Sequence, residues 1–197
     1  MNLALFDFDG TVTTRETMPD FVRRAVPPLR RALGVPAFAP MFAGYRMGLV
    51  AGTTIRNAVT AFGFRGVPVA RVRAAGRRLA TEYIPTVLRP EALQRIAWHR
   101  AQGDVVALVS GGLDFYLAPW CEQHGLELIC SSLEIRGDRL TGRYRGAQCV
   151  GEEKARRVRE RYDLGSYERC YAYGDTHEDE AMLALAQWQF YRGRELG

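Results

Sequence analysis

The feature that most constrains the fold is a series of five short apolar runs, four of which end in or just before glycine, serine or aspartate. The runs cover residues 3–10, 104–112, 126–130, 170–175 and 188–191. Helical patterns are expected between them, at residues 90–102, 113–124, 152–163 and 178–187. Near-continuous apolar strands that alternate with helices indicate a parallel sheet buried on both faces. The sequence therefore predicts an α/β fold with a doubly wound parallel sheet.

Residues 15–85 do not follow this alternation. Their pattern is helical, and Pro27, Pro28, Pro36 and Pro40 are interpreted as helix breakers. The segment is therefore predicted to be a helical cap domain inserted after the first strand, with residues 1–14 and 86–197 forming the core domain. Residues 133–144 are predicted to form a hairpin with a tight turn at Gly137-Asp138.

Composition points to a cytoplasmic globular protein. The 197 residues are 47% hydrophobic, enough for one well-buried core. The first apolar run has no basic residues before it and meets Asp7 too soon for a secretion signal. The four cysteines form no CxxC pair, which favours reduced thiols over a disulfide framework or a zinc site. The apolar run 35–52 is interrupted by prolines, glycines and Arg46, so it is not expected to span a membrane.

The positive charge is concentrated in the predicted cap. Residues 17–85 contain eleven arginines but only two acidic residues, Asp20 and Glu82. A solvated arginine-rich surface explains most of this charge, and attraction of an anion is the functional alternative. A phosphorylated metabolite or an anionic membrane surface fits better than nucleic acid, because no nucleic-acid-binding motif accompanies the charge.

Acidic residues and a hydroxyl follow the predicted strands. Asp7 and Asp9 end the first run, Ser110 and Gly111 end the second, and Asp175 ends the fourth. Because ligands bind beyond the carboxyl ends of parallel strands, these residues are expected along one edge of the sheet. Two carboxylates two residues apart start on one face of a strand and repel each other unless a proton or cation lies between them. This pattern favours a nucleophile, an acid–base group and a hard divalent cation.

Lys154 is the single lysine of a chain that has 27 lysines and arginines in total. It falls in the first turn of a predicted helix, where the helix dipole disfavours a cation unless an anion lies nearby. A compact ammonium group can approach a carboxylate and a phosphoryl oxygen where a planar guanidinium would not fit. Asp179, four residues after Asp175, is interpreted as an acid that orients water or Lys154.

Together, "DFDGT", "VSGG", the lone downstream lysine and "GDTHED" resemble the four ordered motifs of the haloacid dehalogenase superfamily. The cap inserted after the first motif is similar to that of the phosphoserine-phosphatase-like branch. This resemblance implies a Rossmann-like core and a phosphatase that acts through an aspartyl-phosphate intermediate.

The resemblance also implies a role for each matching residue. Asp7 would be the nucleophile and Asp9 the acid and base, and Lys154 would neutralise charge. Mg²⁺ would be held by Asp7, the backbone carbonyl of Asp9 and Asp175. The phosphoryl group would be bound by Thr11, Ser110, Gly111 and Lys154, with Asp179 in support.

The expected substrate is a small phosphorylated metabolite. Glu16 falls where phosphoserine phosphatases place an acid near the substrate amine, which is compatible with an amino substrate. Three alternatives stay open: a phospholipid head group dephosphorylated at the membrane surface, transfer of phosphate to an acceptor other than water, and a receiver-like module that only accepts phosphate. The sequence leaves the oligomeric state open.

Overall fold

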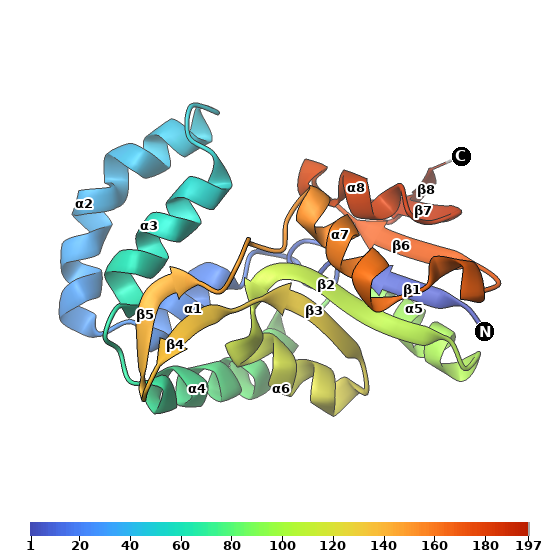
Figure 1. The fold of residues 1–197 in the computed structure, drawn as a ribbon, viewed down its shortest axis with the longest axis horizontal. Coiled ribbons are helices and arrows are strands. Elements are labelled where there is room, and N and C mark those ends of the chain that lie inside the picture. Colours follow the sequence, from blue (N-terminus) through green and yellow to red (C-terminus); the bar gives the residue numbers. More distant parts are fainter. Residues whose placement is uncertain (197) are drawn as a thin grey trace.

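The computed structural model describes residues 1–196 and contains a six-stranded sheet in the order β3-β2-β1-β6-β7-β8 (Figure 1). These strands are β1 (Leu3–Phe6), β2 (Val105–Leu113), β3 (Glu127–Ser131), β6 (Cys170–Gly174), β7 (Trp188–Tyr191) and β8 (Arg194–Leu196). All neighbouring pairs are parallel except β7–β8, which is antiparallel. The predicted α/β fold with a parallel central sheet is confirmed, and β8 is an additional edge strand that was not predicted.

Helices cover both faces of this sheet. The first face carries α5 (Pro90–Ala101) and α6 (Asp114–His124), and the second carries α7 (Glu152–Arg161) and the short α8 (Glu180–Leu183). Along β1, Ala4 and Phe6 join the core on the first face, while Leu3 and Leu5 join the core on the second. This alternation follows from the two-residue period of a strand. The helix predicted at 178–187 is shorter: it begins later, because a 3₁₀ turn covers His177–Asp179, and it ends at Leu183.

The helices that precede α5 form a separate group at one end of the sheet (Figure 1). They are α1 (Met18–Ala25), α2 (Pro28–Arg46), α3 (Gly52–Phe64) and α4 (Val69–Arg78), followed by a π turn over Leu79–Tyr83 and a 3₁₀ turn over Ile84–Thr86. Helix α4 packs closely on α6: a Cβ atom at Gly76 would lie 2.0 Å from the carbonyl oxygen of Phe115. Helices α2 and α3 lie farther from the sheet. The cap boundaries at residues 15 and 85 remain a prediction.

The interpretation of Pro36 and Pro40 as helix breakers is wrong, because both lie inside α2. Proline in a helix leaves the carbonyl group four residues earlier without its usual donor. Here both prolines and Ala32 are exposed, so water can reach the affected turns. Pro27 and Pro28 do mark a boundary, since α1 ends before them and α2 begins at Pro28.

The predicted hairpin is present as β4 (Leu133–Arg136) and β5 (Arg139–Tyr144), and it lies against the cap helices (Figure 1). Strand β5 is hydrogen-bonded to the loop between α3 and α4. The amide of Gly66 donates to the carbonyl of Leu140 at 2.7 Å, and the amide of Leu140 donates to the carbonyl of Val67 at 3.0 Å. The cap is thus supported by a hairpin that comes from the later part of the chain.

Two predictions from composition can be compared with this fold. All four cysteines are free thiols, and three of them are buried. Among residues 1–196, no helix is both long enough and apolar enough to cross a bilayer.

Candidate active site

Two neighbouring strands bring Asp7 and Asp175 together. β1 and β6 are parallel partners, and the amide of Asp7 donates to the carbonyl of Tyr173 at 2.9 Å. Gly10 has a φ of +92°, and a Cβ atom there would lie 2.3 Å from Oδ2 of Asp175. Glycine is therefore required for the chain to turn away from β1 beside that carboxylate. The Thr11 hydroxyl donates to Oδ1 of Asp175 at 3.2 Å.

Lys154 lies between two carboxylates in the interior. Its Nζ atom is 2.5 Å from Oδ1 of Asp7 and 2.5 Å from Oδ1 of Asp179. Only 2% of Lys154 and 1% of Asp179 is exposed, so all three charges are largely desolvated. The other oxygen of Asp179 accepts hydrogen bonds from the amides of Asp175 and Thr176, at 3.1 and 3.0 Å. Asp179 thereby fixes both Lys154 and the loop that carries Asp175.

The three charges shift one another's pKa values. Burial raises the pKa of Asp7 to about 7, although Lys154 opposes the shift. Burial also acts against ionisation of Asp179, but Lys154 and two backbone amides outweigh it and hold the pKa of Asp179 below its ordinary value. Burial lowers the pKa of Lys154, but the charges of Asp7 and Asp179 raise it by more. The pKa of Lys154 therefore lies above its ordinary value. Lys154 is consequently charged at neutral pH, and Asp7 depends on added positive charge for full ionisation.

Asp9 is connected to the cap. Its Oδ1 atom accepts hydrogen bonds from the amide of Thr17 at 3.0 Å and from the Thr17 hydroxyl at 2.7 Å, and Thr17 directly precedes α1. Burial, followed by the charge of Glu16, raises the pKa of Asp9 well above its ordinary value. The Glu16 side chain is exposed, yet partial desolvation of its carboxylate raises the pKa of Glu16 as well, although the positive charge of Arg56 opposes this shift. Asp9 is therefore suited to carry a proton at neutral pH.

Ser110 and Gly111 lie on β2, beside β1. Ser110 is 2% exposed, and its Oγ atom accepts a hydrogen bond from the amide of Gly112 at 3.0 Å. β2 continues to Leu113, but its register with β3 shifts between Ser110 and Leu113, which interrupts the regular ladder at the two glycines. A Cβ atom at Gly111 would lie 2.8 Å from Cγ1 of Val150, in the loop that leads to α7. The Ser110 hydroxyl proton is left available to a ligand at this edge.

Sequence reasoning missed a contact between the cap and the core, formed by Arg56, Gln148 and Glu178. Arg56 of α3 donates to Oε1 of Gln148 at 2.8 Å and to Oε1 of Glu178 at 2.7 Å. Gln148 donates in turn to Oδ1 of Asn57 at 2.9 Å. No pattern distinguishes Arg56 from the other cap arginines, and Glu178 is equally well explained as an acid in the first turn of a helix.

His99 is a buried core residue. Its ring nitrogens lie 2.9 Å from Oδ2 of Asp104 and 2.9 Å from the hydroxyl of Tyr173.

The carboxylates can be assessed as cation ligands. One oxygen from each of Asp7, Asp175 and Asp179 lies within 4.8 Å of the others. The Asp9 carboxylate is outside this group, because it accepts hydrogen bonds from Thr17. Only the backbone carbonyl of Asp9 is predicted from the sequence to bind the metal. Both Asp179 oxygens already accept hydrogen bonds, whereas no bond within residues 1–196 uses Oδ2 of Asp7 or of Asp175. These two oxygens suit a hard divalent cation such as Mg²⁺.

Comparisons with known proteins agree with this geometry. The sequence profile of the haloacid dehalogenase-like hydrolases matches residues 4–184. Protein CicA of Caulobacter vibrioides is 32% identical over 192 residues, covering 96% of this chain and 85% of that protein. A phosphoserine phosphatase of Archaeoglobus fulgidus is 39% identical over 87 residues, covering 43% of this chain and 25% of that enzyme.

Solved structures show the same fold. A protein of unknown function from Bordetella pertussis Tohama I has a TM-score of 0.80 and 25% identity, covering 94% of this chain and 86% of the other. A substrate-bound phosphoserine phosphatase has a TM-score of 0.70 and 23% identity, covering 96% of this chain and 84% of the other. The chain belongs to the haloacid dehalogenase-like hydrolases, and phosphoserine phosphatases are among its relatives and structural neighbours.

Proposed function

We propose that the protein is a Mg²⁺-dependent phosphatase that hydrolyses phosphate monoesters through an aspartyl-phosphate on Asp7. The observation that carries the proposal is the buried position of Asp7 at the carboxyl edge of the sheet, with Nζ of Lys154 2.5 Å from one oxygen. Lys154 fixes the Asp7 carboxylate through one oxygen and leaves the other without a partner among residues 1–196. Phosphoryl transfer depends mainly on such positioning and on neutralisation of charge.

Mg²⁺ would be held by Asp7, Asp175 and, as the family resemblance implies, the Asp9 carbonyl. The free Oδ2 atoms of Asp7 and Asp175 fit this assignment, and Asp179 orients Lys154 and the Asp175 loop. When bound, the ion would supply positive charge that keeps Asp7 ionised and offsets the negative charge of the phosphoryl group.

The chain's own residues account for the remaining chemistry. In the first step, an Asp7 oxygen forms a bond to phosphorus while the bond to the ester oxygen breaks, and Asp9 gives its proton to the departing alkoxide. In the second, Asp9 takes a proton from water as the water oxygen attacks phosphorus, which releases inorganic phosphate and restores Asp7. The raised pKa of Asp9 supports the proton-donor role. Ser110 and the Gly111 amide would bind phosphoryl oxygens, with Thr11 in support.

The expected substrate is a small phosphorylated metabolite. A second candidate, a lipid phosphate at an anionic membrane surface, is favoured by a specific feature of the cap. Helix α2 and the turn after it expose Leu29, Leu33, Met47 and Leu49, with exposed fractions of 58% to 76%, among several arginines. Apolar side chains beside cations are typical of helices that lie on membranes. Co-sedimentation with anionic vesicles at moderate salt would separate the candidates, and absence of binding would eliminate the second.

The test of the proposed function is phosphate release from a panel of soluble phosphomonoesters, phosphoserine included, and one micellar lipid phosphate. Wild type should turn over with Mg²⁺ and lose activity in EDTA, and Asp7→Asn should be inactive. Product analysis with added alcohols distinguishes hydrolysis from transfer to another acceptor. A phosphorylated protein that persists for minutes without turnover would refute the phosphatase mechanism and favour a receiver-like module.

A further inference from the structure

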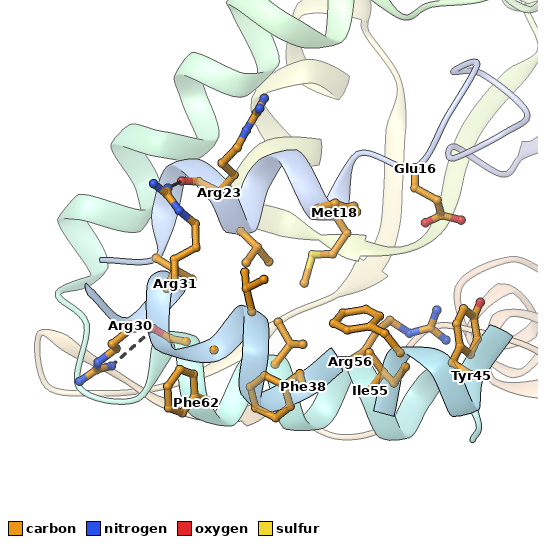
Figure 2. A pocket seen from close by; sticks show the side chains of 18 of the residues that line it. Glu16, Met18, Arg23, Arg30, Arg31, Phe38, Tyr45, Ile55, Arg56 and Phe62 are labelled. Carbon is orange, nitrogen blue, oxygen red and sulfur yellow. Dashed lines mark hydrogen bonds between the residues drawn. The ribbon is translucent and has the colours of Figure 1, made fainter. Parts of the chain in front are cut away.

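A groove runs through the cap between α1, α2 and α3, and we call it the cap groove (Figure 2). Its volume is about 500 Å³, within the range of small-molecule sites. Its walls are mainly apolar and include Val22 of α1, Val35 and Phe42 of α2, and Val59 and Phe62 of α3.

The groove leaves large apolar side chains in water. Val35 is 67% exposed, Phe42 is 46% exposed and Phe62 is 39% exposed, although all three line it. Apolar surface gathered in one concave place commonly marks a binding site. An apolar occupant would remove this surface from water.

One end of the groove adjoins the catalytic carboxylates. Glu16 and Arg56 lie at this end (Figure 2). The residue after Glu16 is Thr17, which holds the Asp9 carboxylate at 2.7 Å, and Arg56 binds Glu178 at 2.7 Å in the loop between Asp175 and Asp179. A molecule that fills the groove and extends past Glu16 would therefore place its polar end at the site of phosphoryl transfer.

The opposite end carries Arg23, Arg30 and Arg31 (Figure 2), but their guanidinium groups donate to protein acceptors. Arg23 donates to Asp20 at 2.5 Å, Arg30 donates to the carbonyl of Arg65 at 2.6 Å, and Arg31 donates to the carbonyl of Arg23. The proposed function instead places the phosphate of an occupant at the Glu16 end, beside Asp7 and Lys154. The part that lies along the groove is apolar.

We propose that the cap groove holds the apolar chain of the substrate, so that the preferred substrates are phosphate monoesters of amphiphilic alcohols. This inference rests on the proposed function, because the phosphate is placed at Asp7. The chain could come from a monomeric amphiphile or from a lipid, and the same contacts would recognise both.

The first experiment measures kcat/KM for n-alkyl phosphates of two, four, six and eight carbons, at concentrations where each is monomeric, beside phosphoserine. We expect kcat/KM to rise about fourfold per added methylene until the groove is filled, since each buried methylene contributes ~0.8 kcal/mol. Equal values along the series would overturn the inference and leave the phosphatase function intact. No hydrolysis of any ester, phosphoserine included, would instead refute the proposed function.

The second experiment changes the groove away from the catalytic residues. Val59→Trp fills it, and Val35→Asp places a charge on its exposed rim, where core packing cannot be affected. Both should abolish the dependence on chain length while kcat/KM for ethyl phosphate stays within about twofold of wild type. Ile135→Trp, at an exposed position of the hairpin outside the groove, is the matched control and should keep the dependence.

Two further outcomes identify other occupants. If long chains are preferred only in micelles or vesicles, the apolar surface contacts a lipid aggregate and the inference is wrong. If Val35→Asp converts a dimer to a monomer in sedimentation and leaves the chain-length dependence unchanged, a second copy of the chain occupies the groove. A monomeric series that rises in wild type and is flat in both groove variants supports the substrate site.

Discussion

Replacing the proposed nucleophile by asparagine should stabilise the metal-free protein. Burial raises the pKa of Asp7 from 3.8 to about 7 in the folded state. Since one pKa unit corresponds to 1.36 kcal/mol, keeping Asp7 ionised in the folded state costs about 4 kcal/mol above pH 7. Asp7→Asn removes that charge, while Lys154 keeps its partner Asp179 at 2.5 Å.

The sign of the pH dependence follows from the raised pKa. Asp7 contributes no penalty below its unfolded pKa of 3.8, and the penalty grows as pH rises toward about 7. The advantage of Asp7→Asn in free energy of unfolding should therefore be about 4 kcal/mol at pH 8 and below about 2 kcal/mol at pH 5. Mg²⁺ should offset much of the penalty in wild type at pH 8 and have little effect on the variant.

The assay is urea denaturation of wild type and Asp7→Asn in EDTA at several pH values, with a repeat in Mg²⁺. Asp138→Asn is the matched control, because that side chain is 83% exposed in the hairpin turn and should change stability little at any pH. An Asp7→Asn variant that is less stable than wild type at pH 8 without metal would refute the reasoning. So would an advantage that does not change between pH 5 and pH 8.

Three further predictions concern other parts of the site. Lys154→Arg should lower kcat by 10²-fold or more, because a planar guanidinium cannot replace a point charge held between two buried carboxylates; restored activity at high Mg²⁺ would contradict this. Ser110→Ala should lower kcat by about 10² to 10³ without abolishing phosphate release, whereas Asp7→Asn should abolish it. Arg56→Met should speed amide hydrogen exchange in α3 about fivefold, since a partly exposed ion pair contributes about 1 kcal/mol. Arg46→Met, at an exposed position of α2, is the control for that measurement and should leave the exchange unchanged.

The arrangement of the core could be predicted because parallel strands place their carboxyl ends at one edge. Asp7 and Asp175 are 168 positions apart in the chain, yet both follow buried strands that are neighbours in the sheet. The glycines beside them were also informative, since Gly10 and Gly174 allow carboxylates to approach closer than a Cβ atom would permit. Such local signals are strong because backbone geometry, rather than distant packing, determines them.

Features that depend on packing between distant segments could not be predicted. Pro36 and Pro40 indicate helix ends by local rules, but an exposed helix surface tolerates them inside α2. The ion pair between Arg56 and Glu178 joins residues 122 positions apart, and nothing in either segment identifies its partner. The cap groove has the same origin, since it arises from the spacing of three helices rather than from any one of them.

The single lysine can now be explained by geometry. Lys154 lies in the first turn of α7, where the helix dipole disfavours a positive charge, and 2% of the residue is exposed. Two carboxylates, each 2.5 Å from Nζ, more than compensate, as the raised pKa of Lys154 indicates. Burial is the main reason that the pKa of Asp7 stays high. With Asp7 and Asp179 both ionised, the three groups also carry a net charge of −1 in the interior, and the charge of Asp179 raises that pKa further. A cation beside the free oxygen of Asp7 would balance the cluster, so the same desolvation that makes Asp7 hard to ionise also favours metal binding.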